Sequence, residues 1–137
     1  MIDDVMLVLE ADSTLMDYLT GGIYSQTEIT RQGTPDAFDA NLEIMPCALV
    51  NQGNQAQTGP YVEDGISAQL YLRVYFYELS GYASIGPAVD RVRELLNRQK
   101  IGDNVWEVAW VNDTQNLRDQ ALDCSLAIST YQVTRLL

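Results

Sequence analysis

Few side chains in this 137-residue chain have types and spacings that could perform chemistry. Histidine, the most common general base and metal ligand, is absent. Cys47 and Cys124 each stand alone in an apolar segment and form no Cys-X-X-Cys motif, so we expect buried, unreactive thiols. We therefore expect no enzymatic activity, no cofactor and no protein-bound metal.

Pairs of acidic residues in predicted loops are the remaining candidates for metal or acid–base chemistry. Asp36 and Asp39 form one pair and Glu63 and Asp64 form another, but neither spacing matches a calcium-binding loop. The glycines likewise match no phosphate-binding motif. We interpret these acids as solvated loop charges and the glycines as turns.

The net charge of −11 argues against nucleic-acid binding, which requires clustered lysine and arginine. Residues 1–43 hold nine acidic residues against one basic residue, Arg31. Four of the eight basic residues instead fall within residues 91–100. This basic cluster is either a solvated helix face with local ion pairs or a patch that attracts a neighbouring subunit.

The segment QLYLRVYFYE, residues 69–78, alternates between two unusual faces. One face is apolar and consists of Leu70, Leu72, Val74 and Phe76. The other face consists of Gln69, Tyr71, Arg73, Tyr75 and Tyr77. Tyrosine and arginine are enriched at protein interfaces. Helices covering both sides of the sheet would also explain this second face, but we favour a protein–protein contact.

Hydrophobic periodicity predicts three helices and five strands, one of which contains this segment. We expect a helix over 2–10, a second short helix capped by Asp12 or Ser13 and ended by Gly21-Gly22, and a third with Pro87 in its first turn. The strands are expected after Gly22 and over 42–52, 66–79, 104–112 and 121–136. Pro46 makes the 42–52 strand an edge or bulged strand, and the two apolar faces of 104–112 suggest cover on both sides.

The order of these elements favours a single α+β domain over residues 1–137, with a mixed, mostly antiparallel sheet flanked by helices on one face. Residues 31–41 are turn-rich, and residues 51–65 are predicted to form a long polar loop. No run is apolar enough to span a membrane, and the acidic start of the chain does not fit an export signal. We therefore expect a soluble intracellular product.

Three stretches together resemble the phage tail terminator-like family. They are MIDDVMLVLEADSTLMDYLTGGIY, then LYLRVYFYELSGYASIGPAVDRVRELLNRQKI, and finally VWEVAWVNDTQNLRDQALDCSLAISTYQVTRL. Their order of helices and strands is similar to that family over nearly the whole chain. The departure is the insert NQGNQAQTGPYVEDG, which is longer and richer in glutamine than the family pattern. This insert would also suit a related neck component.

The resemblance implies a structural virion protein, made in the host cytoplasm, that forms a ring at the neck of a tailed phage. Members of the family form rings, commonly hexameric, that cap the tail tube and provide the docking surface for the head. The implied partners are further copies of the chain, the tail tube protein and the connector or stopper proteins. DNA would pass through the ring without specific binding, and no chemistry is implied.

This interpretation assigns expected roles to three sets of residues. The expected subunit-interface residues are Tyr71, Arg73, Tyr75, Tyr77, Arg91 and Arg93. The expected contacts to the tail or the head lie in the polar loop, at Asn54, Gln55, Gln57 and Tyr61. The acids expected to line the lumen and repel DNA phosphates are Asp3, Asp4 and Asp12.

Three other functions remain open at this point. The chain could be another neck ring, such as an adaptor or a stopper. It could instead be a small-molecule-binding α+β domain, or an enzyme that needs no histidine, although the sequence shows no cluster of converging polar groups. It could also be a regulatory adaptor with one acidic recognition face.

Overall fold

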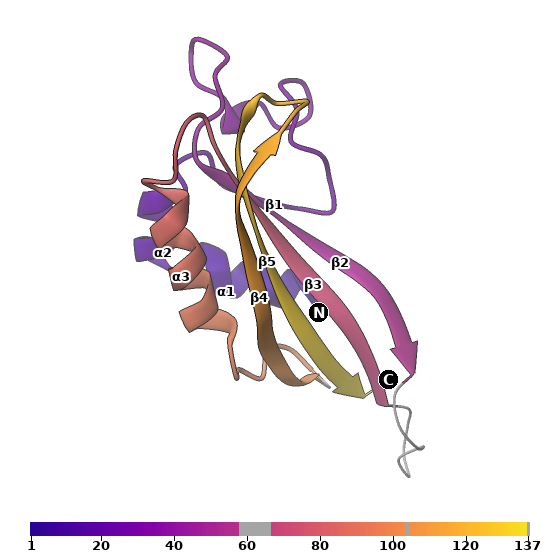
Figure 1. The fold of residues 1–137 in the computed structure, drawn as a ribbon. Helices are drawn as coiled ribbons and strands as arrows, with labels where there is room; N and C mark the ends of the chain where they lie inside the picture. Colours follow the sequence, from indigo (N-terminus) through magenta and orange to yellow (C-terminus); the bar gives the residue numbers. More distant parts are fainter. Residues whose placement is uncertain (58–66, 104, 137) are drawn as a thin grey trace.

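The computed structural model describes residues 1–57, 67–103 and 105–136, and Figure 1 shows their arrangement as one twisted sheet with the α-helices along one side. The elements in chain order are α1 (Ile2–Glu10), α2 (Ser13–Tyr18), β1 (Ile23–Ser25), a 3-10 turn (Pro35–Ala37), β2 (Cys47–Gln57), β3 (Ser67–Glu78), α3 (Ile85–Leu96), β4 (Val105–Asp119) and β5 (Cys124–Leu136). The predicted α+β class is confirmed.

The strands form a single sheet in the order β1-β2-β3-β5-β4. Only β1 and β2 run parallel, and every other pair is antiparallel. The chain passes from β3 through α3 to β4 at the far edge, and β5 then returns between them. The sheet is therefore mixed and mostly antiparallel, as predicted.

The two N-terminal helices form where the apolar spacing and the capping residue predict them. Val5 and Leu9 of α1 are fully buried against the sheet. The carboxylate of Asp12 caps α2 by accepting a hydrogen bond from the backbone N–H of Leu15 at 2.9 Å. The helix ends at Tyr18, and Gly22 then adopts a positive φ of 91° that favours glycine.

The third helix begins at a cap that comes from a neighbouring strand. Oε1 of Glu78, the last residue of β3, accepts hydrogen bonds from the N–H groups of Ser84 and Ile85 at 3.0 and 3.2 Å. These contacts satisfy two of the backbone donors that a helix start leaves free. The buried stripe of α3 consists of Ile85, Ala88, Val89, Val92 and Leu96.

The main core lies between the three α-helices and one face of the sheet. From β3 it contains Leu70, Leu72, Val74 and Phe76, the apolar face predicted from the alternation. The strand β5 adds Ala127, Tyr131 and Val133 to the same core. The helices therefore cover one face of the sheet, and no α-helix of the described residues lies on the other.

A second, smaller core lies on the opposite face of the sheet, at one end. It joins the connection between β1 and β2 to the sheet, and its members are Ile29, Ala37, Phe38, Ile44, Cys47, Leu49, Tyr77 and Cys124. Cys47 and Cys124 are both free and buried, as predicted. The turn-rich connection thus covers part of the face that the helices leave open.

Two sequence expectations about the strands are wrong. Residues 51–57 do not begin a long loop, because they continue β2 in register with β3 as far as Gln57. The segment predicted over 104–112 is not covered on both sides in its described part, because Trp110 and Val111 on the edge strand β4 are 40% and 43% exposed. Bulges near residues 106 and 111 shift the alternation, so period two no longer separates the two faces.

The expectation for Pro46 is confirmed only in part, because β2 contains a bulge but lies between β1 and β3 where it follows the proline. The strand β2 begins directly after this proline, pairs with β1 only through residues 48–50, and contains a bulge between Gln52 and Gln55. Beyond residue 50 the outer side of β2 is therefore an edge of the sheet. None of the helices in the described ranges has the length and apolar character that a membrane crossing requires.

Candidate functional site

The open face of the sheet is the surface that carries the predicted interface residues. Tyr71 is 45% exposed, Arg73 is exposed, and Tyr75 is half-buried. They alternate along β3 with the buried apolar residues that face the helices, so their side chains lie on the side without an α-helix. Their placement agrees with the face predicted from the sequence, and the interface role stays a prediction.

The expectation that Tyr77 belongs to this exposed surface is wrong. Tyr77 is only 7% exposed because the connection between β1 and β2 covers it in the second core. Burial raises the pKa of its phenol above the ordinary value. The open face therefore extends from the far end of the sheet to Tyr75 and stops there.

Arg73 is the charged group on the part of the open face that β2, β3 and β5 form, and Glu107 of β4 lies on the same side of the sheet in an ion pair with Arg98. Among the described residues of β2, β3 and β5 on this side, no other side chain is charged. Its guanidinium lies 5.8 Å from the ring centroid of Tyr71, a cation–π contact. The described residues offer it no carboxylate partner, so its charge and donors face outward.

The cross-strand neighbours of Arg73 on the open face are polar and carry no charge. They are Asn51 of β2 and Thr130 of β5. Farther along the same face, Nε2 of Gln132 donates a hydrogen bond to Oε1 of Gln69 at 3.0 Å. This part of the face therefore presents amides, hydroxyls, two tyrosines and one arginine on a hydrogen-bonded, rigid sheet.

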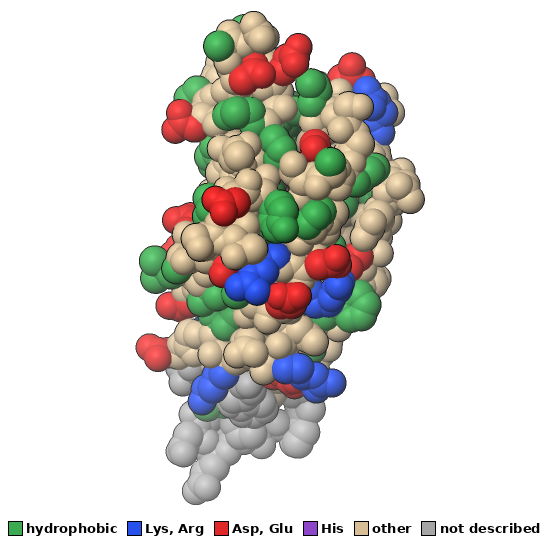
Figure 2. Space-filling model, turned by 90° about the vertical axis from the view of Figure 1, so that its left-hand side faces the viewer, with side chains coloured by type: hydrophobic (Ala, Val, Ile, Leu, Met, Phe, Trp, Pro, Cys, Tyr) green, Lys and Arg blue, Asp and Glu red, His purple; other side chains and the backbone are tan. Residues whose placement is uncertain are grey.

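Arg91 and Arg93, the other predicted interface residues, are engaged within the chain. Arg91 contacts Asp12 at 2.7 Å and Glu94 at 2.9 Å. Arg93 contacts Asp90 at 2.6 Å and a carboxylate of β4 at 2.7 Å. Figure 2, which looks at the helix-bearing side, shows such blue and red side chains next to one another. Of the two alternatives for the basic cluster, the ion-paired helix face matches these contacts.

The three acids expected to line a lumen differ in their surroundings. Asp12 is half-buried and held by Arg91, whose hydrogen bond lowers the pKa of the carboxyl from 3.8 to about 2. Asp3 is exposed and Asp4 is half-buried, both in the first turn of α1. The charge of Asp12 is thus largely compensated within the chain, whereas Asp3 projects into solvent.

The residues predicted to contact the tail or the head lie at the far end of the β2–β3 pair. Asn54, Gln55 and Gln57 are all exposed on β2, and this end of the sheet extends away from the helices in Figure 1. Tyr61 lies outside the described residues. The predicted contact residues that can be placed therefore belong to an ordered strand.

No arrangement for catalysis is found among the described residues. They contain no cluster of acidic, cysteine or histidine side chains that could hold a metal ion. Asp39 has a local structural role, because its Oδ1 accepts hydrogen bonds from the N–H groups of Asn41 and Glu43 at 2.8 and 3.0 Å. Glu63 and Asp64 lie outside the described residues. Burial raises the pKa of the Cys47 thiol to about 12, which disfavours its reactive thiolate form.

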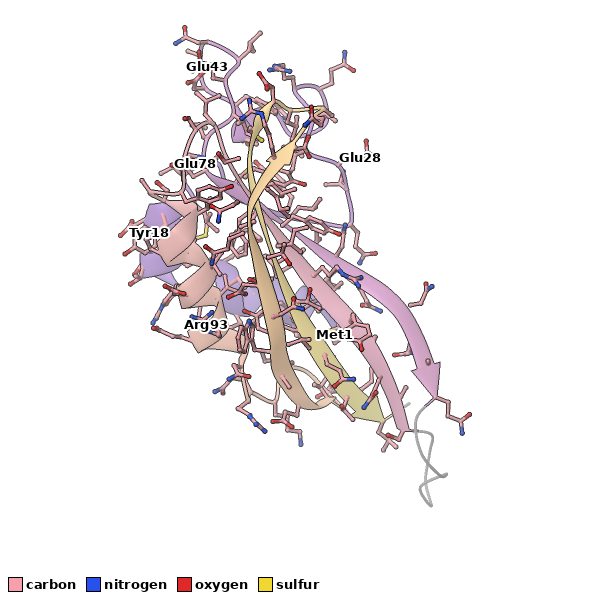
Figure 3. All side chains as sticks on the ribbon, viewed as in Figure 1. Met1, Tyr18, Glu28, Glu43, Glu78 and Arg93 are labelled. Carbon is pink, nitrogen blue, oxygen red and sulfur yellow. The ribbon has the colours of Figure 1, made fainter. Side chains whose placement is uncertain are left out.

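A hollow of about 470 Å³ lies beside the second core. Arg31, Tyr77 and Asp119 contribute polar groups to its wall, and Ile29 and Leu122 contribute apolar ones. Figure 3 shows Glu28, which also lines it, and Glu43 at the end of the molecule opposite the far tip of the β2–β3 pair. The sequence did not indicate this hollow, because its walls come from segments about 90 residues apart.

The exposed aromatic surface of β4 was also missed by sequence reasoning. The indole Nε1 of Trp110 donates to Oδ1 of Asp113 at 3.0 Å, and Arg93 lies 5.2 Å from the ring centroid of the indole. The sequence predicted cover on both sides of this segment. Trp110 lies on the same side of β4 as the buried Val108, and it is exposed at the edge of the sheet.

The fold and its surface thus define an α+β domain with one helix-covered sheet face and one partly open face. No protein-family model matches the sequence, and the search of curated proteins gives no match. Among solved structures, the chain is similar to a chain described as "Virion of native gene transfer agent (GTA) particle", with a TM-score of 0.67. The match has 12% sequence identity and covers 97% of this chain and 92% of that chain. At this identity the likeness shows the fold alone.

Proposed function

We propose that the chain is a non-enzymatic structural protein of a tailed-phage-like virion, where copies form a ring at the neck. The ring caps the tail tube and offers the joining surface for the head. The observation that carries this proposal is the likeness in fold, over almost the full length of both chains, to a chain of a gene transfer agent virion. The open sheet face with Tyr71 and Arg73 supports it, because a ring protein needs contact surfaces between copies.

In this proposal the parts of the molecule have different tasks. The open face, with Tyr71, Arg73 and Tyr75, contacts the neighbouring copy. The exposed end of β2, with Asn54 and Gln57, contacts the tail tube or the connector. The exposed Asp3 and the half-buried Asp4, which lies 3.7 Å from the N-terminal amine, face the passage for DNA and discourage binding of phosphate.

The first experiment measures the mass of the purified chain by light scattering behind a sizing column over a concentration series. A species of six protomers, or a monomer that closes into larger rings as the concentration rises, would support the proposal. Tyr71→Ala should weaken this association while the chain stays folded. A chain that remains monomeric throughout would count against a self-assembling ring.

The position within the neck needs a separate measurement. An adaptor or stopper ring would bind the portal side of the joint, whereas a terminator binds the tail tube. Pull-down of purified tail tubes by the chain, compared with the Asn54→Ala and Gln57→Ala variants, distinguishes the two. Binding to tubes that these substitutions weaken supports the terminator role, and binding to connector rings alone would favour the adaptor or stopper.

A second candidate function is small-molecule binding, which the hollow beside the second core favours. Arg31, Tyr77 and Asp119 bring a cation, a phenol and a carboxylate around about 470 Å³ of space. Thermal-shift screening of small carboxylates and phosphates tests this alternative. A ligand that stabilises the wild-type chain but not Arg31→Ala, together with a strictly monomeric chain, would favour it over the ring.

A further inference from the structure

We infer that the open face of one copy docks against an acidic hollow beside β1 of the next copy, with Arg73 entering that hollow. This inference rests on the proposed ring and specifies which two surfaces meet in it. The occupant of the open face is therefore a second copy of this chain.

Within the part of the chain that the structure describes, Arg73 has no carboxylate partner. Five of the other arginines are already engaged within the chain by ion pairs, by a ring contact or by a backbone carbonyl: Arg31, Arg91, Arg93, Arg98 and Arg118. Among the described residues, Arg73 has the ring of Tyr71 and the backbone of Gly53 beside it and no carboxylate. An arginine fork between two tyrosines is typical of the residues that dominate interface energies. A carboxylate on the neighbouring copy would give Arg73 an ion pair.

Another surface of the same chain matches this need. A hollow of about 420 Å³ lies where the end of α1, α2, the start of β1 and the 3-10 turn meet. The carboxylates of Glu10 and Asp36 both line it, together with Met16 and Tyr24. Within the described residues, neither carboxylate forms an ion pair with an arginine or lysine.

The hollow also offers apolar contacts for the tyrosines that flank Arg73 on the open face. Met16 offers an adaptable apolar side chain for a tyrosine ring. The ring of Tyr24 is held in place because its hydroxyl donates to the carbonyl of Gly21 at 2.7 Å. An arginine flanked by tyrosines can therefore find both carboxylates and apolar contacts in one recess.

The positions of the two surfaces decide the kind of assembly. The hollow lies beside β1 at one edge of the sheet, whereas Arg73 lies on the open face of β3. Two unlike surfaces produce a head-to-tail contact, which closes into a ring when the rotation between copies allows it. A twofold contact between two open faces would instead bring two unpaired copies of Arg73 together. Charge therefore favours the head-to-tail contact.

The test reverses the charges one at a time and then together. Arg73→Glu and Glu10→Arg should each weaken self-association, measured by light scattering, by about tenfold or more because like charges would then meet. The chain carrying both substitutions should regain most of the association, since the ion pair is rebuilt in the opposite sense. Lys100→Glu, at an exposed lysine with no ion pair among the described residues, is the control for the change in charge and should assemble like the wild-type chain.

Three outcomes would overturn the inference. If Arg73→Glu associates as strongly as the wild-type chain, this contact is wrong while the ring itself stands. The same conclusion follows if both single variants are weakened and the combined variant is not restored. A wild-type chain that stays monomeric at every concentration overturns both the contact and the self-assembling ring. Urea unfolding verifies that each variant is folded, and Arg73→Gln and Glu10→Gln replace any reversal that is not.

Discussion

Arg93 on α3 donates a hydrogen bond through Nη1 to Oδ2 of Asp113 on β4 at 2.7 Å, and this contact ties the third helix to the edge strand. Figure 3 shows Arg93 on α3, at the side of the helix next to β4. The side chain of Asp113 is only 12% exposed, and its Oδ1 also accepts from the hydroxyl of Ser129 at 2.7 Å and the indole of Trp110. One carboxylate thus connects a helix and two strands.

We predict that the two carboxylates bound to Arg93 differ in their effect on stability. Asp113→Ala should lower the free energy of unfolding by about 1–3 kcal/mol, because it leaves several donors without their acceptor. Asp90→Ala removes the exposed partner of the same arginine and should change the free energy of unfolding by less than about 0.5 kcal/mol. Urea unfolding of the three chains measures both effects. Equal losses for the two variants would contradict the prediction.

The ion pair between Asp12 and Arg91 should make the stability depend on pH in acid. The hydrogen bond from Arg91 lowers the pKa of Asp12 from 3.8 to about 2 in the folded chain. Because the folded pKa lies below the ordinary value, the contribution is present above about pH 4 and is lost as the pH falls toward 2. Unfolding midpoints in urea, measured between pH 2 and 7, report this loss.

Asp12→Asn is the control for that pH dependence. The amide oxygen of asparagine can still cap α2, but the side chain has no charge to titrate. The difference in stability between wild type and this variant should therefore be largest near neutral pH and should shrink below pH 4. A difference that stays constant down to pH 2 would show that Asp12 is not the titrating group.

The two faces of β3 should respond differently to truncation. Phe76→Ala removes a fully buried ring from the main core and should lower the free energy of unfolding by about 3–5 kcal/mol. Tyr71→Ala on the open face should change it by less than about 0.5 kcal/mol. Tyr71→Ala should weaken self-association, measured by light scattering, more than Phe76→Ala does in the fraction of chains that stay folded. A large loss of stability in Tyr71→Ala would mean that the open face is structural.

The start of α3 should depend on Glu78. Glu78→Ala removes the acceptor for the N–H groups of Ser84 and Ile85 and should lower the free energy of unfolding by about 1 kcal/mol. Glu78→Gln keeps an acceptor oxygen and should recover much of this loss. Hydrogen exchange of the first turn of α3 provides a local readout. Unchanged protection in Glu78→Ala would argue against the cap.

The two thiols should be protected from reagents in the folded chain. Burial raises the pKa of Cys47 to about 12 and that of Cys124 to about 11, so the reactive thiolate is scarce at pH 8. A maleimide should therefore label the native chain slowly and label both cysteines quickly in urea. Fast labelling without denaturant would show that the second core opens readily.

Local patterns were sufficient to predict most of the elements of this protein. The spacing of Val5 and Leu9, the cap at Asp12 and the alternation along 69–78 depend on residues close together in the chain. Such short-range signals specify helices, turns and the buried face of a strand without reference to the rest of the fold. The α+β class follows from their order.

Only the tertiary structure decided which side chains stay exposed and free to contact another molecule. Tyr77 has the same alternation as Tyr71, yet the connection between β1 and β2 covers it. Arg91 is compensated by Asp12, which lies 79 residues earlier in the chain. Val108 and Trp110 lie on the same side of the edge strand β4, yet Val108 is buried and Trp110 is 40% exposed. These outcomes depend on contacts between segments far apart in the chain, and local periodicity carries no information about which distant segment will cover a given face.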